Sequence, residues 1–262
     1  MSGARAGQSS RIPLSAVVIA WNEEKRIGDC LDSLSFADEV VVVDSGSTDD
    51  TVGVARARGA RVVGMAWMGF GPQKQTAVDA ASHDLVLNLD CDERVTPELS
   101  AEIEGILRQG GPACAAWTVP RRTFLGSKEI RHCGWHPDRT TRLFDRRRAR
   151  FSDDLVHERV IVDGPTGELA APMLHHSFDG LADLLVKLNR YSDLSARQMA
   201  EKGRRCGWAD LLLRPPFAFL KTFVLRLGFL DGVEGFVVSC TTAMLSFAKY
   251  AKLRELTRGE RR

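Results

Sequence analysis

The sequence predicts an α/β fold, in which a mainly parallel sheet carries helices on both faces and a helical region follows it. Short apolar runs alternate with helix-forming segments through the first half of the chain. Such alternation implies parallel strands joined by helical crossovers. At the other end of the chain, apolar stretches are mixed with basic residues. This composition predicts helices that lie outside the sheet.

Four apolar segments are the expected parallel strands. They are Leu14–Ala20, Glu39–Val43, Arg61–Gly64 and Leu85–Leu89. The helices expected between them are 22–34, about 50–58 and 73–81. A further helix begins at Thr96-Pro97-Glu98, because a capping Thr, a Pro at the first helical position and an early acid are typical of a helix start.

The second half of the chain predicts an antiparallel extension of the sheet. Its strand candidates are short and irregularly linked: Ala115–Pro120, Thr140–Phe144, Val156–Val162 and Leu169–His175. Apolar residues then recur at helical spacing from Leu181 to Tyr191. We therefore expect an amphipathic helix from Asp179 to about Lys202.

Length and composition fit one large domain with an appendage. The chain has 262 residues, of which 44% are hydrophobic and 27% are charged, as in ordinary globular proteins with a full core. We expect a flexible tail over residues 1–12, a main domain over 13–205 and an apolar, basic helical appendage over 206–262.

The net charge of +2 conceals two basic patches. Residues 121–150 hold ten Arg or Lys against three acids, and the last fourteen residues hold six against two. Such patches suit phosphates or an anionic membrane surface, although a solvated basic face has the same composition.

The six cysteines are expected to be reduced thiols. No two of them form a C-x-x-C pair, and their spacing does not match a zinc site. Reduced thiols are typical of a cytoplasmic protein. We recognise no signal peptide at the N-terminus.

The C-terminal region is expected to contact a membrane surface. Its apolar runs, such as Phe217–Leu220 and Phe236–Ala248, are flanked by Lys and Arg. No uninterrupted apolar run approaches the ~20 residues that span a bilayer, so an interfacial helix is favoured. The alternative is a helical hairpin packed on the core or on a second subunit.

The most informative stretch is Asp90-Cys91-Asp92-Glu93, which follows the strand Leu85–Leu89. Two carboxylates one residue apart at a strand end point the same way, because side chains alternate with period 2. Converging oxygen ligands suit Mg²⁺ or Mn²⁺, which share carboxylates with phosphate-bearing substrates. Read alone, the pattern is also compatible with an acidic turn that leads into a helix.

A second acid, Asp44, ends another strand and is followed by the hydroxyl-rich turn Ser45–Thr51. A carboxylate here can accept hydrogen bonds from a nucleobase or a ribose, and Gly46 lets the backbone approach a ligand closely. In the alternative, one of residues 47–49 only caps the following helix.

Three motifs together resemble the family 2 glycosyltransferases with a GT-A fold, over roughly residues 13–178. They are Val18–Glu24, Val41–Thr51 and Leu89–Glu93. More closely, the chain resembles the bacterial lipopolysaccharide core β-glucosyltransferases of that family. The segments behind this closer match are Trp67–Lys74, Arg142-Leu143-Phe144, Val156-His157-Glu158, Lys187–Ser192 and Gly228–Gly232. The resemblance implies a Rossmann-like mixed sheet and makes 13–205 the GT-A catalytic domain.

The resemblance also implies a UDP-sugar donor, a divalent metal and inversion at the anomeric carbon. Residue by residue, Asn22 and Glu23 would lie near the nucleotide, and Asp44 would contact the uracil or ribose. Asp90 would face the ribose and metal-bound waters, and Asp92 would be the principal metal ligand. Cys91 departs from the subgroup, which more often has a small residue such as Ala. It would be open to oxidation if exposed.

A histidine can complete the metal shell, as in several GT-A enzymes. Strand alternation allows only one of His175 and His176 to face the site. The subgroup pattern resembles His-x-Ser-aromatic, so we expect His175 to be the ligand. A buried, satisfied histidine is the alternative.

Cations and a base complete the expected site. Lys74, Arg139 and Arg142 are candidate phosphate contacts, since a departing nucleotide diphosphate develops negative charge. Direct displacement also needs a base that takes the acceptor hydroxyl proton. The candidates are Asp153, Asp154, His157 and Glu158. In the family this base is an acid after the metal motif, so we favour Glu158 and then Asp154, while His157 could orient the acceptor or the base.

We therefore expect an inverting transferase that moves a hexose, glucose from a UDP-sugar, onto a lipid-linked glycan such as the inner-core heptose of lipopolysaccharide. It would work at the inner face of the cytoplasmic membrane and bind no nucleic acid. A polyprenyl phosphate or an exopolysaccharide is the alternative acceptor. A metal-dependent nucleotidyltransferase usually brings a Gly-rich phosphate loop, which we do not find. A non-catalytic sugar-nucleotide binder is a further alternative. The presence of both Asp90 and Asp92 argues against it.

Overall fold

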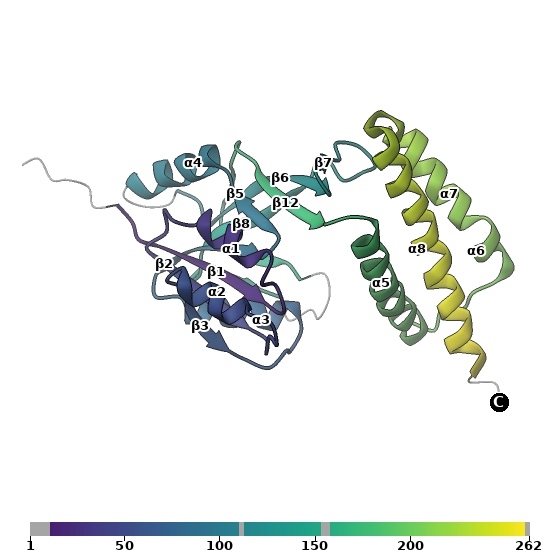
Figure 1. Ribbon diagram of the computed structural model, residues 1–262, viewed down its shortest axis with the longest axis horizontal. Coiled ribbons are helices and arrows are strands. Elements are labelled where there is room, and N and C mark those ends of the chain that lie inside the picture. Colours follow the sequence, from purple (N-terminus) through teal and green to yellow (C-terminus); the bar gives the residue numbers. More distant parts are fainter. Residues whose placement is uncertain (1–10, 110–112, 153–157, 260–262) are drawn as a thin grey trace, which may run out of the picture. The chain divides into compact units, whose positions relative to one another are not determined.

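The structure is a computed structural model that describes residues 11–109, 113–152 and 158–259. These residues fall into two compact units (Figure 1). Unit 1 contains residues up to 121 together with 139–175, and unit 2 contains 122–138 together with the residues from 176 onward. This division differs from the expected boundary after residue 205, because helix α5 (Leu181–Glu201) packs along the C-terminal helix and belongs to unit 2.

Within the described residues, ten strands form one mixed sheet. The strand order is β3 (Arg61–Gly64), β2 (Glu39–Asp44), β1 (Leu14–Ala20), β4 (Leu85–Asp90), β8 (Arg139–Asp145), β6 (Ala116–Leu125), β12 (Met173–Phe178) and β5 (Glu93–Val95). The short strands β11 (Thr166–Glu168) and β7 (Lys128–Glu129) also pair with β6. Two further strands, β9 (Ala149–Phe151) and β10 (Val160–Val162), form a separate ribbon.

The first four strands of this order run parallel to one another, whereas β8 is antiparallel to both β4 and β6. This confirms the expected fold class: a parallel half built from strand–helix units, followed by an antiparallel extension. The central strand β1 is buried on both sides along most of its length, as parallel strands covered by helices usually are.

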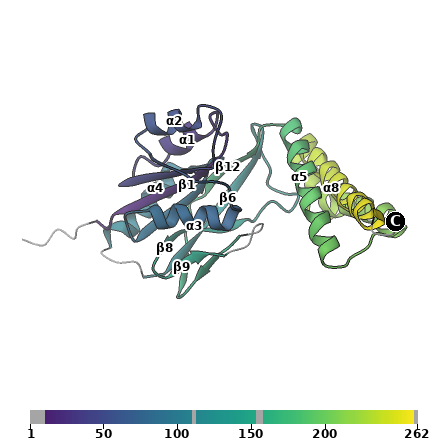
Figure 2. The same ribbon diagram turned by 90° about the horizontal axis from the view of Figure 1, so that it is seen from below.

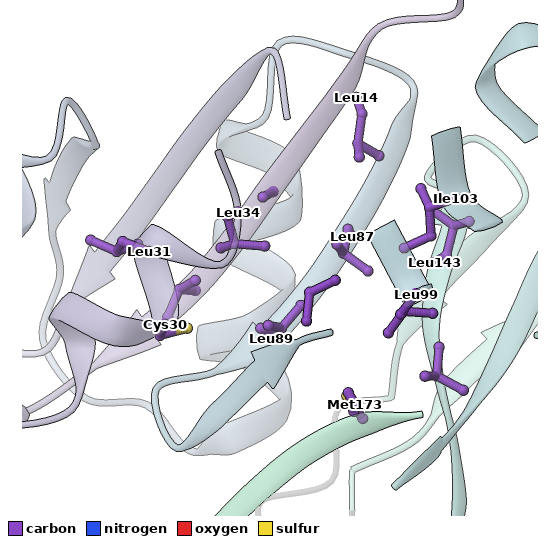
Figure 3. Close-up of a cluster of buried hydrophobic side chains, with 14 of the residues drawn as sticks. Leu14, Cys30, Leu31, Leu34, Leu87, Leu89, Leu99, Ile103, Leu143 and Met173 are labelled. Atoms are coloured by element: carbon purple, nitrogen blue, oxygen red, sulfur yellow. The ribbon is translucent and has the colours of Figure 1, made fainter. Parts of the chain in front are cut away.

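Helices cover both faces of the sheet in unit 1 (Figure 2). On one face lie α1 (Ile27–Asp32), α2 (Thr51–Ala57) and α4 (Pro97–Arg108). Leucines and isoleucines of α1 and α4, together with Ala55 of α2, meet every second residue of β1 and β4 in one core cluster. Figure 3 shows part of the cluster. On the other face lies α3 (Phe70–Ala80), whose Ala77 and Val78 pack against Val17 and Phe144. Alternation along the strands thus supplies both cores.

Several boundaries differ from those expected. Helix α3 begins at Phe70, three residues early, because Gly69 takes a positive φ of 105° and sets the helix entry. The expected strand Val156–Val162 appears only as Val160–Val162; residues 156 and 157 lie outside the described residues. The expected strand Leu169–His175 starts later and continues to Phe178.

Unit 2 is built mainly from helices. They are α5, α6 (Trp208–Leu212), α7 (Arg214–Leu220), the π-turn η1 (Lys221–Leu225), the 3₁₀-turn η2 (Gly228–Asp231) and α8 (Gly232–Gly259). Both α5 and α7 lie along α8 (Figure 1). The ammonium of Lys252 on α8 donates hydrogen bonds to two residues of α5, Asn189 Oδ1 at 2.7 Å and Ser192 Oγ at 2.7 Å. The motif Lys187–Ser192 therefore supports helix packing.

One helix in the described part of the chain is long and apolar enough to cross a membrane, judged by length and composition alone. It runs from Gly228 to Arg258, and its most apolar window has a mean hydropathy of 1.2 and is 33% buried. The search for an uninterrupted apolar run did not find this helix. Ser239, Thr241 and Thr242 interrupt the apolar run without adding charge.

Candidate active site

Three parallel strands of unit 1 end nearly level with one another. In the sheet register Ala20 of β1 pairs with Asp44 of β2, and Ile19 pairs with Asp90 of β4. The residues that follow these strands therefore share one edge of the sheet, which is where open α/β sheets bind their ligands.

Asp44 organises the turn that follows β2. Its Oδ2 accepts hydrogen bonds from the backbone N–H groups of Gly46 and Ser47, both at 3.0 Å, and its Oδ1 accepts one from Ser47 Oγ at 2.5 Å. Gly46 has a φ of +87°, and a Cβ there would meet nothing within 4 Å. Glycine is therefore favoured by backbone conformation rather than by lack of space.

The turn after β1 is bonded to the turn after β2. Asn22, with a φ of 55°, accepts a hydrogen bond from the Thr48 N–H at 2.8 Å through Oδ1. The N–H of Glu23 donates to Thr51 Oγ1 at 2.8 Å. The N-cap residue of α2 is Asp50, and no side chain caps this helix. Asp49 Oδ1 instead accepts the Thr51 N–H at 3.1 Å within the turn. The two turns thus form a preorganised rim.

The carboxylate of Asp90 lies between two buried cations. Its Oδ1 is 2.8 Å from Lys74 Nζ, and its Oδ2 is 2.6 Å from Arg142 Nη2. Burial alone would raise the pKa of Asp90, but the charges of Arg142 and Lys74 outweigh burial and hold this pKa well below its usual range. Asp90 is therefore ionised near neutral pH.

Glu93 is a buried residue of the site. It belongs to the motif Asp90–Glu93, but the sequence alone assigned it no function. Its side chain is fully buried, and its Oε1 lies 2.6 Å from Arg142 Nη2 and 3.3 Å from Arg121 Nη1. Its Oε2 accepts the backbone N–H of Asp90 at 3.1 Å. In β5 the side chains of Glu93 and Val95 are buried and that of Arg94 is less so, but a strand of three residues is too short for this alternation to be recognised in the sequence.

Asp92 and His175 face each other. His175 Nε2 lies 3.5 Å from Asp92 Oδ2, and both side chains are mostly buried. The antiparallel pairing of β12 with β5 places His175 opposite Glu93 and so beside the acidic turn. The neighbouring His176 instead stacks on Phe124, with ring centroids 5.0 Å apart.

The donor chemistry of Asp92 and His175 fits a divalent cation, since carboxylate oxygen and imidazole nitrogen are common metal ligands. Asp90 differs from the expected ligand set, because both of its oxygens contact cations. Within the described ranges no group of three or more His, Cys, Asp or Glu side chains is arranged to hold a metal.

Lys74 also contacts the favoured base. Its Nζ lies 2.8 Å from Glu158 Oε1 as well as from Asp90 Oδ1. Glu158 therefore reaches the sheet edge, although it is far from Asp90 in sequence. The other base candidates, Asp153, Asp154 and His157, lie outside the described residues.

Arg139 lies apart from these cations. Its guanidinium donates to the carbonyls of Thr118 at 3.2 Å and Leu169 at 2.7 Å, and it lies 3.6 Å from a carboxylate oxygen of Glu168. These contacts support the pairing around β6. Arg142, rather than Arg139, is the arginine that joins Lys74 at Asp90.

Cys91 is buried, and its thiol donates to the carbonyl of Ile19 at 3.2 Å. Burial raises the pKa of Cys91 well above its usual value, and it does the same for nearby Cys30. The condition for oxidation at this position, an exposed thiol, is therefore not met.

Gln73 is a second residue to which the sequence assigned no role. It is fully buried on α3, and its Nε2 donates to Ser45 Oγ at 3.0 Å. In the described part of the chain, only Gln73 Oε1 and Arg142 Nε are buried side-chain polar atoms without a hydrogen-bond partner. Both lie in one cluster at the sheet edge, since Gln73 contacts Ser45 after β2 and Arg142 contacts Asp90 at the end of β4. Unsatisfied buried groups are rare in folded proteins.

Comparisons with known proteins identify the family of this chain. A family model described as "Glycosyl transferase family 2" matches residues 15–161. Over 250 residues the chain is 31% identical to the lipopolysaccharide core biosynthesis glycosyltransferase LpsC of Rhizobium meliloti, covering 93% of this chain and 92% of that protein. It is 32% identical over 253 residues to an uncharacterized glycosyltransferase of Rickettsia conorii, covering 92% and 90% of the two chains.

A solved structure is also similar in part. It is glucosyl-3-phosphoglycerate synthase from Mycobacterium tuberculosis in complex with Mn²⁺, UDP and glucosyl-3-phosphoglycerate. The match has a TM-score of 0.36 and 32% identity, and it covers 45% of this chain and 46% of that one.

The mixed sheet and the family match define a glycosyltransferase with a GT-A-like fold. The chain belongs to glycosyl transferase family 2.

Proposed function

We propose that this glycosyltransferase moves glucose from a UDP-sugar onto the inner-core heptose of a lipopolysaccharide acceptor, with inversion at the anomeric carbon. The similarity to LpsC over 93% of the chain supports a core-glycan acceptor. The resemblance of the strand-end motifs to nucleotide-sugar sites supports the donor.

One observation carries the proposal more than any other. The sheet edge concentrates Lys74 and Arg142 at Asp90, and Asp92 on the same acidic turn faces His175 of β12. The two unsatisfied buried polar atoms belong to the same cluster. An anionic, hydrogen-bonding ligand such as a nucleotide diphosphate suits this composition.

In the proposed mechanism the chain binds the nucleotide through its rim and the diphosphate through its cations. Asp44 accepts hydrogen bonds from the base or ribose, exchanging part of its contact with Ser47. A divalent cation held by Asp92 and His175 would neutralise charge that develops on the departing diphosphate. Lys74 and Arg142 add fixed positive charge in a largely dry site, where it stabilises a developing anion most strongly.

Glu158 is the proposed base. It would take the proton of the acceptor hydroxyl as that oxygen attacks the anomeric carbon from the face opposite the diphosphate. Lys74, 2.8 Å from Glu158 Oε1, orients this carboxylate. The same lysine also touches Asp90, so it links the acceptor side of the site to the donor side.

We further propose that the protein acts as a peripheral protein at the inner face of the cytoplasmic membrane. Of the exposed large hydrophobic side chains in the described residues, all but Trp21, Trp67, Met68 and Ile161 belong to unit 2. Apolar surface of this extent marks interaction sites, and a lipid-linked acceptor would be reached at a membrane.

The test is a transfer assay with defined acceptors. Purified protein is incubated with UDP-glucose, with Mg²⁺ or Mn²⁺, and with either a heptose-terminated core oligosaccharide or a polyprenyl phosphate. We expect UDP release and glucosylation of the heptose acceptor. Transfer to polyprenyl phosphate alone would overturn the acceptor, and release of pyrophosphate instead of UDP would overturn the reaction class.

A further inference from the structure

The turn that joins α7 to α8 in unit 2 is unusually apolar at its surface. This α7–α8 turn, residues 221–233, includes η1 and η2. Leu225 and Val233 are 71% and 73% exposed, and Leu230 is 57% exposed. Exposed apolar side chains also include Val224, Leu227 and Phe229. Residues of this type are seldom gathered in one exposed turn unless something covers them.

The backbone of the turn is bonded largely to itself. The N–H of Arg226 donates to the carbonyl of Lys221 at 2.9 Å, and that of Leu227 donates to Val224 at 3.1 Å. The N–H of Leu230 donates to Leu227 at 2.9 Å. Irregular backbone tolerates a lipid environment only when its polar groups are satisfied internally, so these bonds suit contact with lipid.

Two glycines make the turn compact. A Cβ on Gly235 would lie 1.9 Å from the carbonyl oxygen of Gly228, and a Cβ on Gly228 would lie 2.8 Å from Cys133 Sγ. The start of α8 therefore crosses the turn in direct backbone contact. The apolar side chains are carried on a preformed support, which reduces the entropy lost on binding.

The one acid within η2 points into the protein. Asp231 is buried, and its carboxylate accepts the N–H of Arg131 at 3.2 Å and the N–H of His132 at 2.8 Å. The ring Nδ1 of His132 lies 2.9 Å from Asp231 Oδ1. This explains the motif Gly228–Gly232: its glycine permits close packing and its acid anchors the turn to the segment 131–133.

The charges left at the surface of the turn are positive. Lys221 and Arg226 are exposed, whereas Arg131 beside the turn is paired with Glu129 at 3.0 Å. Glu234, at the start of α8, is only partly exposed. Apolar side chains surrounded by exposed cations complement a bilayer with anionic headgroups, because the cations reach the headgroups while the apolar groups enter the acyl boundary.

We propose that the α7–α8 turn inserts into the interface of an anionic lipid bilayer and is the main membrane contact of this protein. The proposal rests on the membrane location put forward above and names the segment responsible. The competing occupant of this surface is a second copy of the chain. Its own exposed cations would then lie against Lys221 and Arg226, and like charges repel one another.

The test is flotation of the full chain with vesicles of phosphatidylcholine, with and without phosphatidylglycerol. The variant Leu225→Glu/Leu230→Glu places two charges on the turn, and Leu181→Glu/Val186→Glu is the matched control on α5, where both residues are also exposed. We expect the turn variant to bind anionic vesicles at least about tenfold more weakly, and the control to bind like the wild type.

Two outcomes would overturn the proposal. The first is that the turn variant floats with anionic vesicles as well as the wild type does. The second is that analytical ultracentrifugation finds a dimer for the wild type and a monomer for the turn variant. This result would assign the surface to a second copy of the chain. Circular dichroism melting confirms that each variant is folded.

Transfer to a soluble heptose oligosaccharide separates this proposal from the proposed function. A turn variant that loses flotation but keeps soluble transfer supports insertion and leaves the transferase proposal intact. Wild-type protein that floats but transfers to no acceptor supports insertion and contradicts the transferase proposal.

Discussion

His175 Nε2 lies 3.5 Å from Asp92 Oδ2, although 83 positions separate the two residues in the chain. The pairing of β12 with β5 creates this proximity. Asp90, two residues before Asp92, contacts Lys74 and Arg142 instead. The two acids of the Asp-x-Asp motif therefore have different surroundings and, in our proposal, different tasks.

Lys74 is expected to couple the two carboxylates that it touches. Lys74→Met leaves Asp90 with Arg142 alone and removes the ammonium from Glu158. We expect a loss of about 2–3 kcal/mol in unfolding free energy, below the ~3–5 kcal/mol of a fully buried pair, because Asp90 keeps one cation and some access to water.

A double-mutant cycle checks this coupling. Urea unfolding of Lys74→Met, Glu158→Gln and the double variant should give an interaction energy of about 1 kcal/mol. Additive effects of the two substitutions would contradict a direct Lys74–Glu158 contact.

Glu93 is expected to position Arg142. Glu93→Gln removes the buried charge that holds Arg142 at 2.6 Å and Arg121 at 3.3 Å. We expect about 3 kcal/mol of destabilisation and a fall of about tenfold in kcat, with a smaller change in the KM for the acceptor. The matched control is Glu129→Gln, which breaks the ion pairs of Glu129 with Arg122 and Arg131 in unit 2. If both variants changed kcat alike, Glu93 would have no specific role at the site.

Glu39 makes the stability of the protein depend on pH. Burial would raise its pKa, but hydrogen bonds from Ser15, Arg61 and Ser82 outweigh burial and lower the pKa to about 2. The carboxylate therefore stabilises the fold above its unfolded pKa of about 4.5, and this contribution is lost as the pH falls from there toward 2. We expect a contribution of about 2–3 kcal/mol at neutral pH.

Urea titrations between pH 2 and pH 7 measure this effect. The unfolding free energy of Glu39→Gln should lie below that of the wild type at neutral pH, and the two curves should converge on acidification. A constant difference across this range would contradict the assignment.

The cysteines are expected to differ in reactivity. Cys30, Cys91 and Cys133 are buried, whereas Cys114, Cys206 and Cys240 are partly exposed. Burial is also the main cause that raises the pKa of Cys133 to about 11. Mass spectrometry after brief iodoacetamide treatment at neutral pH should find label on the second group, and on the first only after unfolding. Rapid labelling of Cys91 in folded protein would contradict its buried environment.

The parallel half of the fold was predictable because its strands are short, mainly apolar runs separated by helix-forming segments. The convergence of three strand ends at one edge of the sheet was predictable for the same reason. Strand β5 was missed, since it has only three residues and carries Glu93 at a buried position. Three-residue elements give no usable periodicity, and a buried acid contradicts the usual pattern of burial.

Contacts between distant segments were beyond prediction. Nothing in the local sequence shows that Arg142, 52 positions later, takes up one oxygen of Asp90, or that Lys74 on α3 takes up the other. The helical spacing of α5 was recognised, but its membership of unit 2 depends on contacts with α8 such as that of Lys252 with Asn189. Pairing across the chain, rather than local propensity, decides these features.

In our proposal, Asp92 and His175 hold a divalent cation for transfer from a UDP-sugar. The most direct measurement compares UDP release in the presence of acceptor for the wild type, Asp92→Ala and His175→Gln, each with Mn²⁺ and with EDTA. His176→Gln is the matched control. We predict metal-dependent release by the wild type and the control, and a loss of about 10²–10³ in kcat for the two ligand variants. Undiminished release in EDTA, or by Asp92→Ala, would contradict the claim.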